Sequence, residues 1–141
     1  MKTITNKLTL TAAYILITCT IIITNTATAG MADTMINEYI QQGAKPSAEA
    51  GKALWNREFI HAKSKGKAHR CASCHTNNLT KIGKHFRTGK LIEPMAPSIN
   101  SERFTERKKI NKWFKRNCKW TVGRECTVQE KADVLVYLKN L

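Results

Sequence analysis

The chain has 141 residues, which is enough for one small domain with a single hydrophobic core and too few for several domains. It carries 24 lysine and arginine residues against 10 aspartate and glutamate residues, a formal charge of +14 at pH 7. Such an excess keeps a protein soluble and attracts it to acidic surfaces, so an acidic protein, an anionic membrane and a nucleic acid are the candidate partners.

The first 29 residues have the pattern of a secretory signal peptide. Lys2 and Lys7 form a short basic start, the segment 8–23 is mostly apolar, and Ala27-Thr28-Ala29 is a small-residue cleavage site. We predict cleavage after Ala29 and export to the periplasm. A retained anchor is disfavoured because the apolar core is shorter than the roughly 20 residues that a membrane span needs, and we expect Cys19 to leave with the signal.

Two helices are predicted before residue 60. Asp33 or Thr34 can cap a short helix that runs through Gln42. A second helix starts at Ser47, and one face of it is apolar through Gly51, Leu54, Trp55 and Phe59. Residues 61–70 are basic and small, which predicts a surface loop without packed side chains.

The stretch Cys71-Ala72-Ser73-Cys74-His75 is a C-x-x-C-H motif, the signature of covalent c-type haem attachment. A thioredoxin-like site is disfavoured because the polar flanks carry no strand pattern. A zinc site is disfavoured because the other downstream cysteines, Cys118 and Cys126, are eight residues apart and lack metal-ligand spacing. We predict one haem c, attached through Cys71 and Cys74, with His75 as the proximal iron ligand.

The chain after the haem motif is polar and punctuated by glycine, with room for a short helix around Thr80 to Phe86. Residues 91–100 contain Pro94 and Pro97, which exclude a regular helix or a central strand, so we predict a fixed loop. From Ser101 to Arg116 a helix is indicated by an apolar stripe of Phe104, Ile110, Trp113 and Phe114.

A capping box of Thr127 and Glu130 opens a last helix that runs to Leu141. Because no segment after the signal alternates with the period of a strand, the predicted fold class is all-α. Cleavage leaves four cysteines, of which two bind haem, and we expect Cys118 and Cys126 to form a disulfide in an oxidising compartment.

The order of these features resembles class I cytochrome c. A helix with Gly51-x-x-Leu54-Trp55 comes first, C-x-x-C-H follows, and the last helix ends in Val134-Leu135-Val136-Tyr137-Leu138-Lys139. The resemblance implies a small fold in which the first and last helices cross nearly at right angles. Gly51 and Tyr137 match the glycine and the aromatic residue at that crossing, where a missing Cβ lets the two backbones approach.

Three stretches resemble the SHP-type cytochromes, a small class I group named after the sphaeroides haem protein: Trp113-Phe114-Lys115-Arg116-Asn117-Cys118, Gly123-Arg124-Glu125-Cys126-Thr127 and Glu93-Pro94-Met95-Ala96-Pro97-Ser98. The similarity covers about residues 47–141, so we expect a monohaem domain there and an N-terminal extension at 30–46. It implies an asparagine as distal ligand in the ferric state, beside a disulfide-closed loop.

Asn117 is the expected distal ligand. Ile110, Trp113, Phe114 and Asn117 follow helical spacing, so Asn117 ends the stripe that we expect to face the haem. Met95 is the main alternative ligand and His85 a weaker one, and a helix C-cap is the alternative role of Asn117. Trp113 is expected to pack on the haem, and the carbonyl of Pro94 or Pro97 to accept a hydrogen bond from His75 Nδ1.

An amide is a weak ligand that suits Fe(III) better than Fe(II), so we expect Asn117 to leave the iron on reduction. The ferrous haem would then bind O2, NO or CO, with the Asn117 NH2 group as a hydrogen-bond donor. The alternative is a conventional electron-transfer cytochrome that retains Met95. Catalytic turnover of a small molecule is a third hypothesis, for which the sequence offers no acid-base pair.

The basic surface predicts an acidic redox partner or an anionic membrane surface. Nucleic acid is disfavoured because an exported haem protein rarely meets it. The SHP resemblance implies a dihaem cytochrome c and a membrane cytochrome b as partners, and no stable membrane span is expected after cleavage.

Overall fold

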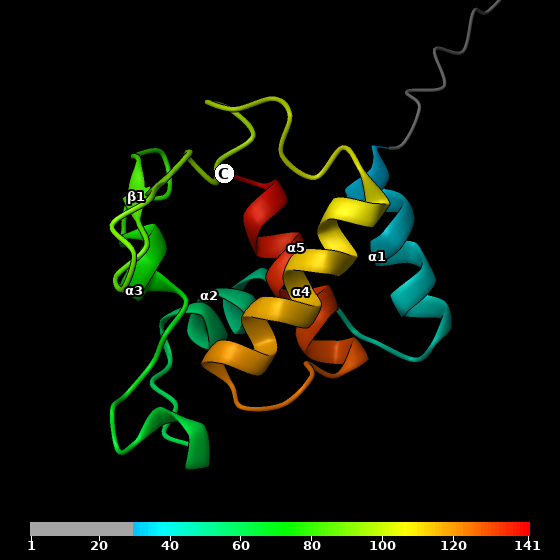
Figure 1. Ribbon diagram of the computed structural model, residues 1–141. Helices are drawn as coiled ribbons and strands as arrows, with labels where there is room; N and C mark the ends of the chain where they lie inside the picture. Colours follow the sequence, from blue (N-terminus) through cyan, green and yellow to red (C-terminus); the bar gives the residue numbers. More distant parts are fainter. Residues whose placement is uncertain (1–29) are drawn as a thin grey trace, which may run out of the picture.

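The computed structural model describes residues 30–141, which form five α-helices, one 3₁₀ helix and a two-stranded hairpin (Figure 1). Their bounds are α1 Met31–Gln41, α2 Ala48–Asn56, η1 Ala62–Ser64, α3 Ala72–His75, β1 Gly83–Lys84, β2 Leu91–Ile92, α4 Arg107–Thr121 and α5 Val128–Lys139. The predicted signal peptide lies outside the described residues. Within 30–141, no helix combines the length and the apolar character needed to cross a membrane.

Helix α5 lies at the centre of the core, because α1 and α2 both pack against it. The α1 side of the core contains Met35, Ile36 and Tyr39 with Ile110 of α4 and Leu135 of α5. The α2 side is formed by Trp55, Ala72, Leu79, Val134 and Leu138. Residues 30–46, which the sequence suggested as an extension, therefore supply one side of the domain core.

The predicted approach of the first class I helix to the last is confirmed at Gly51. A Cβ added to this glycine would run into the Asp133 carbonyl oxygen of α5 and would lie 2.9 Å from Tyr137 Cβ. Only a residue without a side chain fits such a crossing. Asp133 is itself buried and accepts a 2.8 Å hydrogen bond from the Ser47 N–H, which ties the start of α2 to α5.

The N-terminal caps of α1 and α5 can be compared with those predicted from the sequence. The capping box of α5 is confirmed, since Thr127 Oγ1 accepts from the Glu130 N–H at 3.1 Å and Glu130 Oε2 accepts from the Thr127 N–H at 2.8 Å. The start of α1 was predicted too late. Gly30 is the N-cap and the helix begins at Met31, so Asp33 lies in the first turn, where it pairs with Lys139 at 2.8 Å.

The short helix predicted around Thr80 to Phe86 is wrong, as is the expected absence of strands. Gly83 and Lys84 pair antiparallel with Ile92 and Leu91, and the chain reverses between them with Gly89 at φ +69°. The inner face of this hairpin rests on α3, because a Cβ on Gly83 would collide with the Cys74 carbonyl oxygen. The loop predicted at 91–100 thus begins with two strand residues, and the all-α class still holds.

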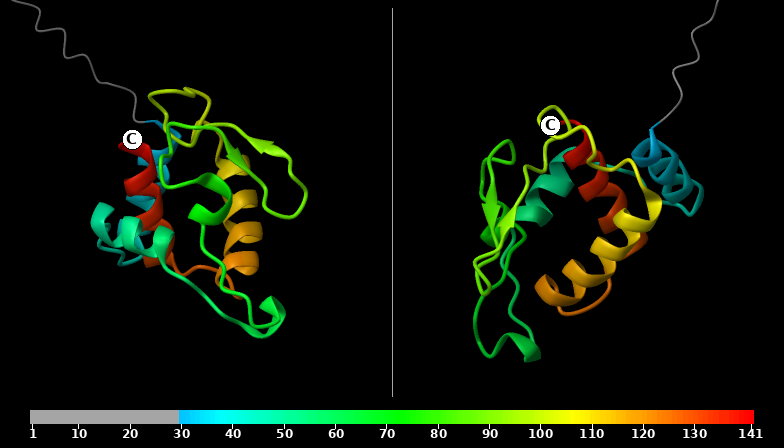
Figure 2. Two further views of the ribbon diagram at one scale, coloured as in Figure 1. Left: turned by 90° about the vertical axis from the view of Figure 1, so that its left-hand side faces the viewer. Right: turned by 45° about the horizontal axis from the view of Figure 1, so that its top comes forward.

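Two predictions around residue 60 are also wrong. Helix α2 ends at Asn56, so Phe59 is not on its apolar face but forms an isolated antiparallel bridge with His69. The segment 61–70 contains η1, a buried Ser64 and two histidines that pack, so it is not an unpacked loop. In space, residues 57–92 lie on one side of α2, α4 and α5, away from α1 (Figure 2).

The helix predicted at 101–116 is shifted toward the C-terminus. Phe104 lies before it, in the left-handed region at φ +61°, and Glu106 is the N-cap. The helix then continues to Thr121, five residues beyond the predicted end. This shift places Asn117 and Cys118 inside α4 rather than in a loop, which changes how both can act.

Candidate haem site

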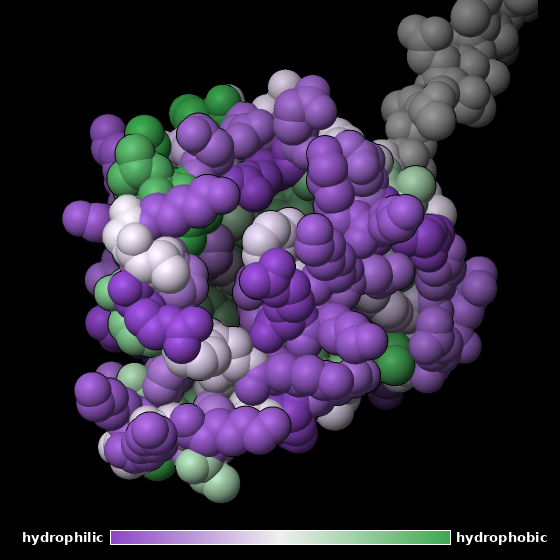
Figure 3. Space-filling view, viewed as in Figure 1, coloured by the Kyte–Doolittle hydropathy of each residue, from purple (hydrophilic) through white to green (hydrophobic). Residues whose placement is uncertain are grey.

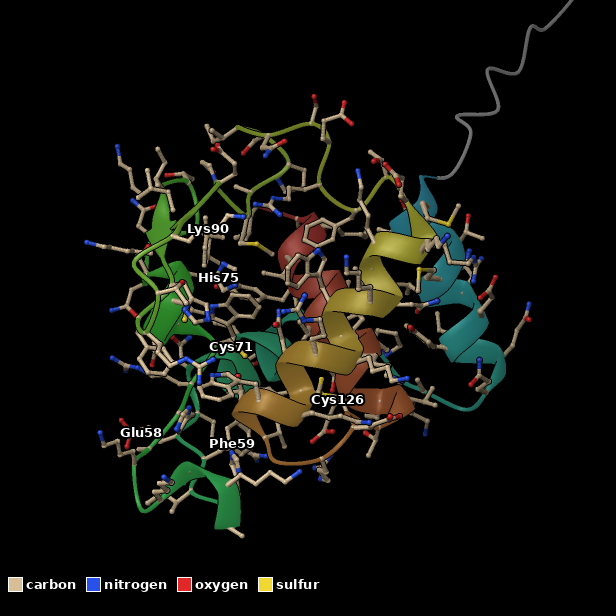
Figure 4. The ribbon with its side chains drawn as sticks, in the orientation of Figure 1. Glu58, Phe59, Cys71, His75, Lys90 and Cys126 are labelled. Carbon is tan, nitrogen blue, oxygen red and sulfur yellow. A yellow bond between two sulfur atoms is a disulfide. The ribbon has the colours of Figure 1, made fainter. Side chains whose placement is uncertain are left out.

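The C-x-x-C-H motif forms the single turn of α3. Cys71 is its N-cap, and Cys74 and His75 end it. Both cysteines are free thiols with half-buried side chains. Figure 4 shows Cys71 and His75 on the side of α3 that faces α4. One helical turn thus gathers two thiols and an imidazole, the donor set of a covalently attached haem.

His75 is held in the form that binds iron. Burial, with a smaller effect from the Arg103 charge, lowers the pKa of His75 to about 4, so the imidazole is neutral at physiological pH. The ring packs against Trp55 at a centroid distance of 5.3 Å. Among the described residues His75 makes no side-chain hydrogen bond, and of its ring nitrogens only Nδ1 is fully buried. The accessible Nε2 is therefore free to bind a metal.

Helix α4 comes near α3 at Cys71. Burial raises the pKa of the Cys71 thiol to about 11, and the nearby hydroxyl of the buried Thr121 has a smaller effect in the opposite direction. Asn117 and Trp113 stand one and two turns before Thr121, at intervals of four residues, so all three lie on one stripe of α4. From Thr121, which lies near Cys71, the stripe leads back along α4 toward the start of the helix.

Asn117 has an exposed side chain, and within the described part of the chain its amide makes no hydrogen bond. The alternative role as a helix C-cap is wrong, because α4 continues to Thr121 and Val122 is the C-cap. The predicted stripe also needs correction. Ile110 is buried on the α1 side of the core and Phe114 packs beside it, whereas Trp113 remains 47% exposed.

The alternative ligands lie in other settings. Met95 packs against the cluster of Trp55, Ala72 and Leu79, and its N–H donates to the Leu79 carbonyl at 2.9 Å. His85 lies in the turn of the hairpin, where Nδ1 accepts from the Thr88 N–H at 3.2 Å. Met95 is thus on the Trp55 side of His75, and His85 is engaged locally.

The predicted hydrogen bond from His75 to a prolyl carbonyl is absent from the described residues. Arg103 takes the Pro94 carbonyl instead, since its Nε donates to that oxygen at 2.7 Å and Nη2 donates to the Glu93 carbonyl at 2.6 Å. Pro97 lines a surface hollow together with Met31 and Phe104. The loop 93–97 is therefore held by a half-buried arginine that the sequence did not single out.

A second feature missed in the sequence is the contact that holds the C-terminal end of α4. Trp120 packs edge-on against His69 at 5.0 Å and stacks on Phe86 at 5.7 Å. Its carbonyl lies 3.1 Å from His61 Nε2, and a Cβ on Gly123 would stand 2.7 Å from His61 Cγ. The only signal for this cluster was the presence of aromatic residues in polar surroundings.

Cys118 lies in the last turn of α4 and Cys126 near the end of the α4–α5 connection, both buried, with Cα atoms 5.5 Å apart. That separation is within the range that disulfides require. The pair follows Asn117 directly, so whatever holds Cys118 also holds the last turn of α4.

Comparison with known proteins places these features among haem proteins. A family model described as a domain of unknown function, DUF1924, matches residues 41–138. Cytochrome c'' of Methylophilus methylotrophus is 43% identical over 93 residues, which are 66% of this chain and 63% of that protein, so the chain spans under two thirds of its length. The cytochrome c-type protein SHP of Cereibacter sphaeroides is 43% identical over 98 residues, 68% of this chain and 72% of SHP.

The solved structures agree with the sequence match. Oxidised SHP, described as an oxygen-binding cytochrome c, superposes with a TM-score of 0.72 at 36% identity and covers 81% of this chain and all of that one. The solution structure of cytochrome c'', reported for the structural basis of haem-ligand detachment, gives a TM-score of 0.64 at 38% identity over 76% of this chain and 90% of that one. The all-α fold and the resemblance seen in the sequence are confirmed.

Proposed function

Since this chain belongs to the DUF1924 family and is an SHP-type monohaem c-type cytochrome, we propose that it exchanges electrons and binds a small ligand under the control of its redox state. Haem c, attached through Cys71 and Cys74, supplies an iron that changes between two oxidation states and binds O2, NO or CO when ferrous. His75 holds the iron from the proximal side through Nε2.

Asn117 is the distal residue in this proposal, and one observation carries it. Its amide is free and accessible on α4, one turn before Thr121, which lies near Cys71. The amide oxygen is a hard, weak donor that suits Fe(III). In the ferrous protein Asn117 would no longer hold the iron, and its NH2 group would be available to donate a hydrogen bond to an incoming ligand.

The position of Met95 supports this assignment over a conventional electron carrier with methionine and histidine ligands. Its side chain is packed with Leu79 and Trp55, and the Trp55 ring lies at a tilt against His75. This packing favours Asn117 over Met95 as the second residue that would hold the iron.

The test is an absorption spectrum of the reduced holoprotein with and without CO. We expect CO to shift the ferrous spectrum, and a six-coordinate ferrous spectrum that ignores CO would contradict the proposal. Asn117→Ala should let the ferric protein bind azide more readily, because the amide no longer competes. Asn111→Ala, an exposed asparagine of the same helix, is the matched control and should leave both spectra unchanged.

We also propose that Cys118 and Cys126 form a disulfide and that the mature protein is periplasmic after cleavage at Ala29. The close, buried pair supports the bond. Mass analysis after alkylation of the unfolded, purified protein should label neither cysteine before reduction and both after it. Labelling of both cysteines without reduction would contradict the disulfide, and the last turn of α4 would then lack a covalent link to Cys126.

A further inference from the structure

The charge of this protein is concentrated on the segment that carries the haem motif. Residues 57–92 hold nine lysine and arginine residues and a single acidic residue, Glu58. The rest of the described chain holds 13 basic and nine acidic residues. The segment lies on one side of the molecule (Figures 1 and 2), so most of the excess positive charge is on that side.

Within this segment, the hairpin presents one face to solvent. Side chains alternate along a strand, and paired residues share a face, so Ile82, Lys84 and Leu91 project together on the side opposite Gly83 and Ile92. Leu91 is 64% exposed and Ile82 is 54% exposed. Figure 3 shows hydrophobic residues gathered at the upper left, in the region of the hairpin and the loop after β2.

Three lysines adjoin these two aliphatic residues: Lys84 shares their face, and Lys81 and Lys90 are their neighbours in the chain. Lys81, Lys84 and Lys90 are all exposed, and no ion pair among residues 30–141 involves them. Figure 4 shows Lys90 on the hairpin side of His75. An exposed apolar patch rimmed by one sign of charge is the usual form of a transient protein-docking surface.

The inner face of the hairpin brings this patch close to the haem motif. Gly83 contacts the Cys74 carbonyl, and a Cβ there would lie 3.0 Å from His75 Cα. Only the thickness of a two-stranded ribbon therefore separates the exposed face from the residue that holds the iron.

We propose that the outer face of the β1–β2 hairpin, made by Ile82, Lys84 and Leu91 with the adjoining Lys81 and Lys90, docks an acidic redox protein. The reduced partner gives up one electron, which passes by way of Gly83 and His75 and reduces the ferric haem. This inference rests on the proposed function only in requiring that a protein reduces the haem.

The other basic surface, on α4, fits such a partner less well. Arg107, Lys109 and Lys119 are already paired with Glu38, Glu106 and Glu125. Its exposed apolar residues are Trp113, with Lys112 and Arg116 over the ring, and Trp120, so α4 offers no free aliphatic surface. An anionic membrane would match the charge of the hairpin but supplies no electron.

The test uses the holoprotein and flavodoxin, an acidic one-electron donor, as probe. We expect oxidised flavodoxin to shift the backbone NMR signals of Ile82, Lys84 and Leu91. The triple variant Lys81→Glu, Lys84→Glu, Lys90→Glu should lower the second-order rate constant for reduction by about tenfold at low ionic strength. The matched triple variant Lys108→Glu, Lys112→Glu, Lys115→Glu carries the same charge change on α4 and should lower it less than about threefold.

Leu91→Ser separates contact from charge. It should lower the rate by about threefold without changing its salt dependence. If the hairpin triple variant does not fold, the single variants Lys90→Glu and Lys115→Glu take its place with the same expected order. The proposal would be overturned by NMR shifts confined to α4, or by an equal loss of the reduction rate in both triple variants. It would also be overturned if the hairpin triple variant kept the wild-type reduction rate but lost binding to phosphatidylglycerol vesicles. CO binding by the ferrous protein is independent of these variants, so each proposal can fail alone.

Discussion

Two glycines decide how closely the main elements of this protein approach one another. Gly51 lets α2 cross α5, and Gly83 lets the hairpin lie on α3, the turn formed by the C-x-x-C-H motif. In both places the neighbouring atoms belong to the backbone, which cannot move aside as a flexible side chain would. A single methyl group is therefore a large change at either position.

Gly51→Ala should destabilise the protein by about 1–3 kcal/mol, because the added Cβ meets the Asp133 carbonyl and the cost is that of overpacking. Urea unfolding followed by circular dichroism measures the change. Lys52→Ala, the exposed next residue of the same helix, is the control and should shift the free energy of unfolding by no more than about 0.5 kcal/mol. Equal stability of the two variants would mean that α2 and α5 do not meet at Gly51.

At the scale of elements, α4 is held at both ends. Near its start, Arg107 Nη1 donates to Glu38 Oε2 of α1 at 2.6 Å. At its end, Trp120 packs on His69 and Phe86, and the buried Cys118 faces Cys126. Asn117 lies between these supports, so its position relative to the C-x-x-C-H motif depends on contacts made by three different segments of the chain.

The capping box at the start of α5 should make the stability of the fold depend on pH through Glu130. Hydrogen bonds from Arg124, and then from the Thr127 N–H, lower the pKa of Glu130 from 4.5 to about 2, against burial. A depressed pKa stabilises the fold above pH 4.5, and this contribution is lost as the pH falls to about 2.

Glu130→Gln should therefore be less stable than wild type at pH 6, and the difference should shrink between pH 4.5 and 2. Denaturant unfolding at a series of pH values measures it. Arg124→Gln removes the main hydrogen-bond partner of Glu130. The pH range over which Glu130→Gln and its parent converge in stability should then be narrower. A difference that stays constant down to pH 2 would exclude the ionised carboxylate as the source.

For the molecule as a whole, α1 is part of the core although the family match begins only at residue 41. Met35 is 2% exposed and contacts the cluster that includes Ile110 of α4 and Leu135 of α5. Glu38 of α1 also pairs with Arg107 of α4. Helix α1 therefore supports α4 from the side opposite α3.

Met35→Ala should cost about 3 kcal/mol of unfolding free energy, the usual cost of emptying a buried site of this size. Ile40→Ala removes a comparable side chain that is 47% exposed on the same helix and should cost less than about 1 kcal/mol. Thermal unfolding of the holoprotein compares them. If both variants melt with the wild type, α1 is not needed by the core.

Features that depend on near neighbours in the chain could be predicted from the sequence. The haem motif needs five consecutive residues, the capping box of α5 needs four, and the close approach of Gly51 followed from the resemblance of two helices. The helical class also followed, because the apolar residues recur with the period of a helix.

Other features depend on how the helices pack. They are the hairpin in place of a helix, the shift of α4 that puts Asn117 within it, the capture of the Pro94 carbonyl by Arg103, and the packing of Trp120 on His69, a residue far from it in sequence. Each pairing is chosen by which surfaces remain to be buried once the helices have met. Local propensity carries no information about that choice, because the competing conformations differ in their distant contacts.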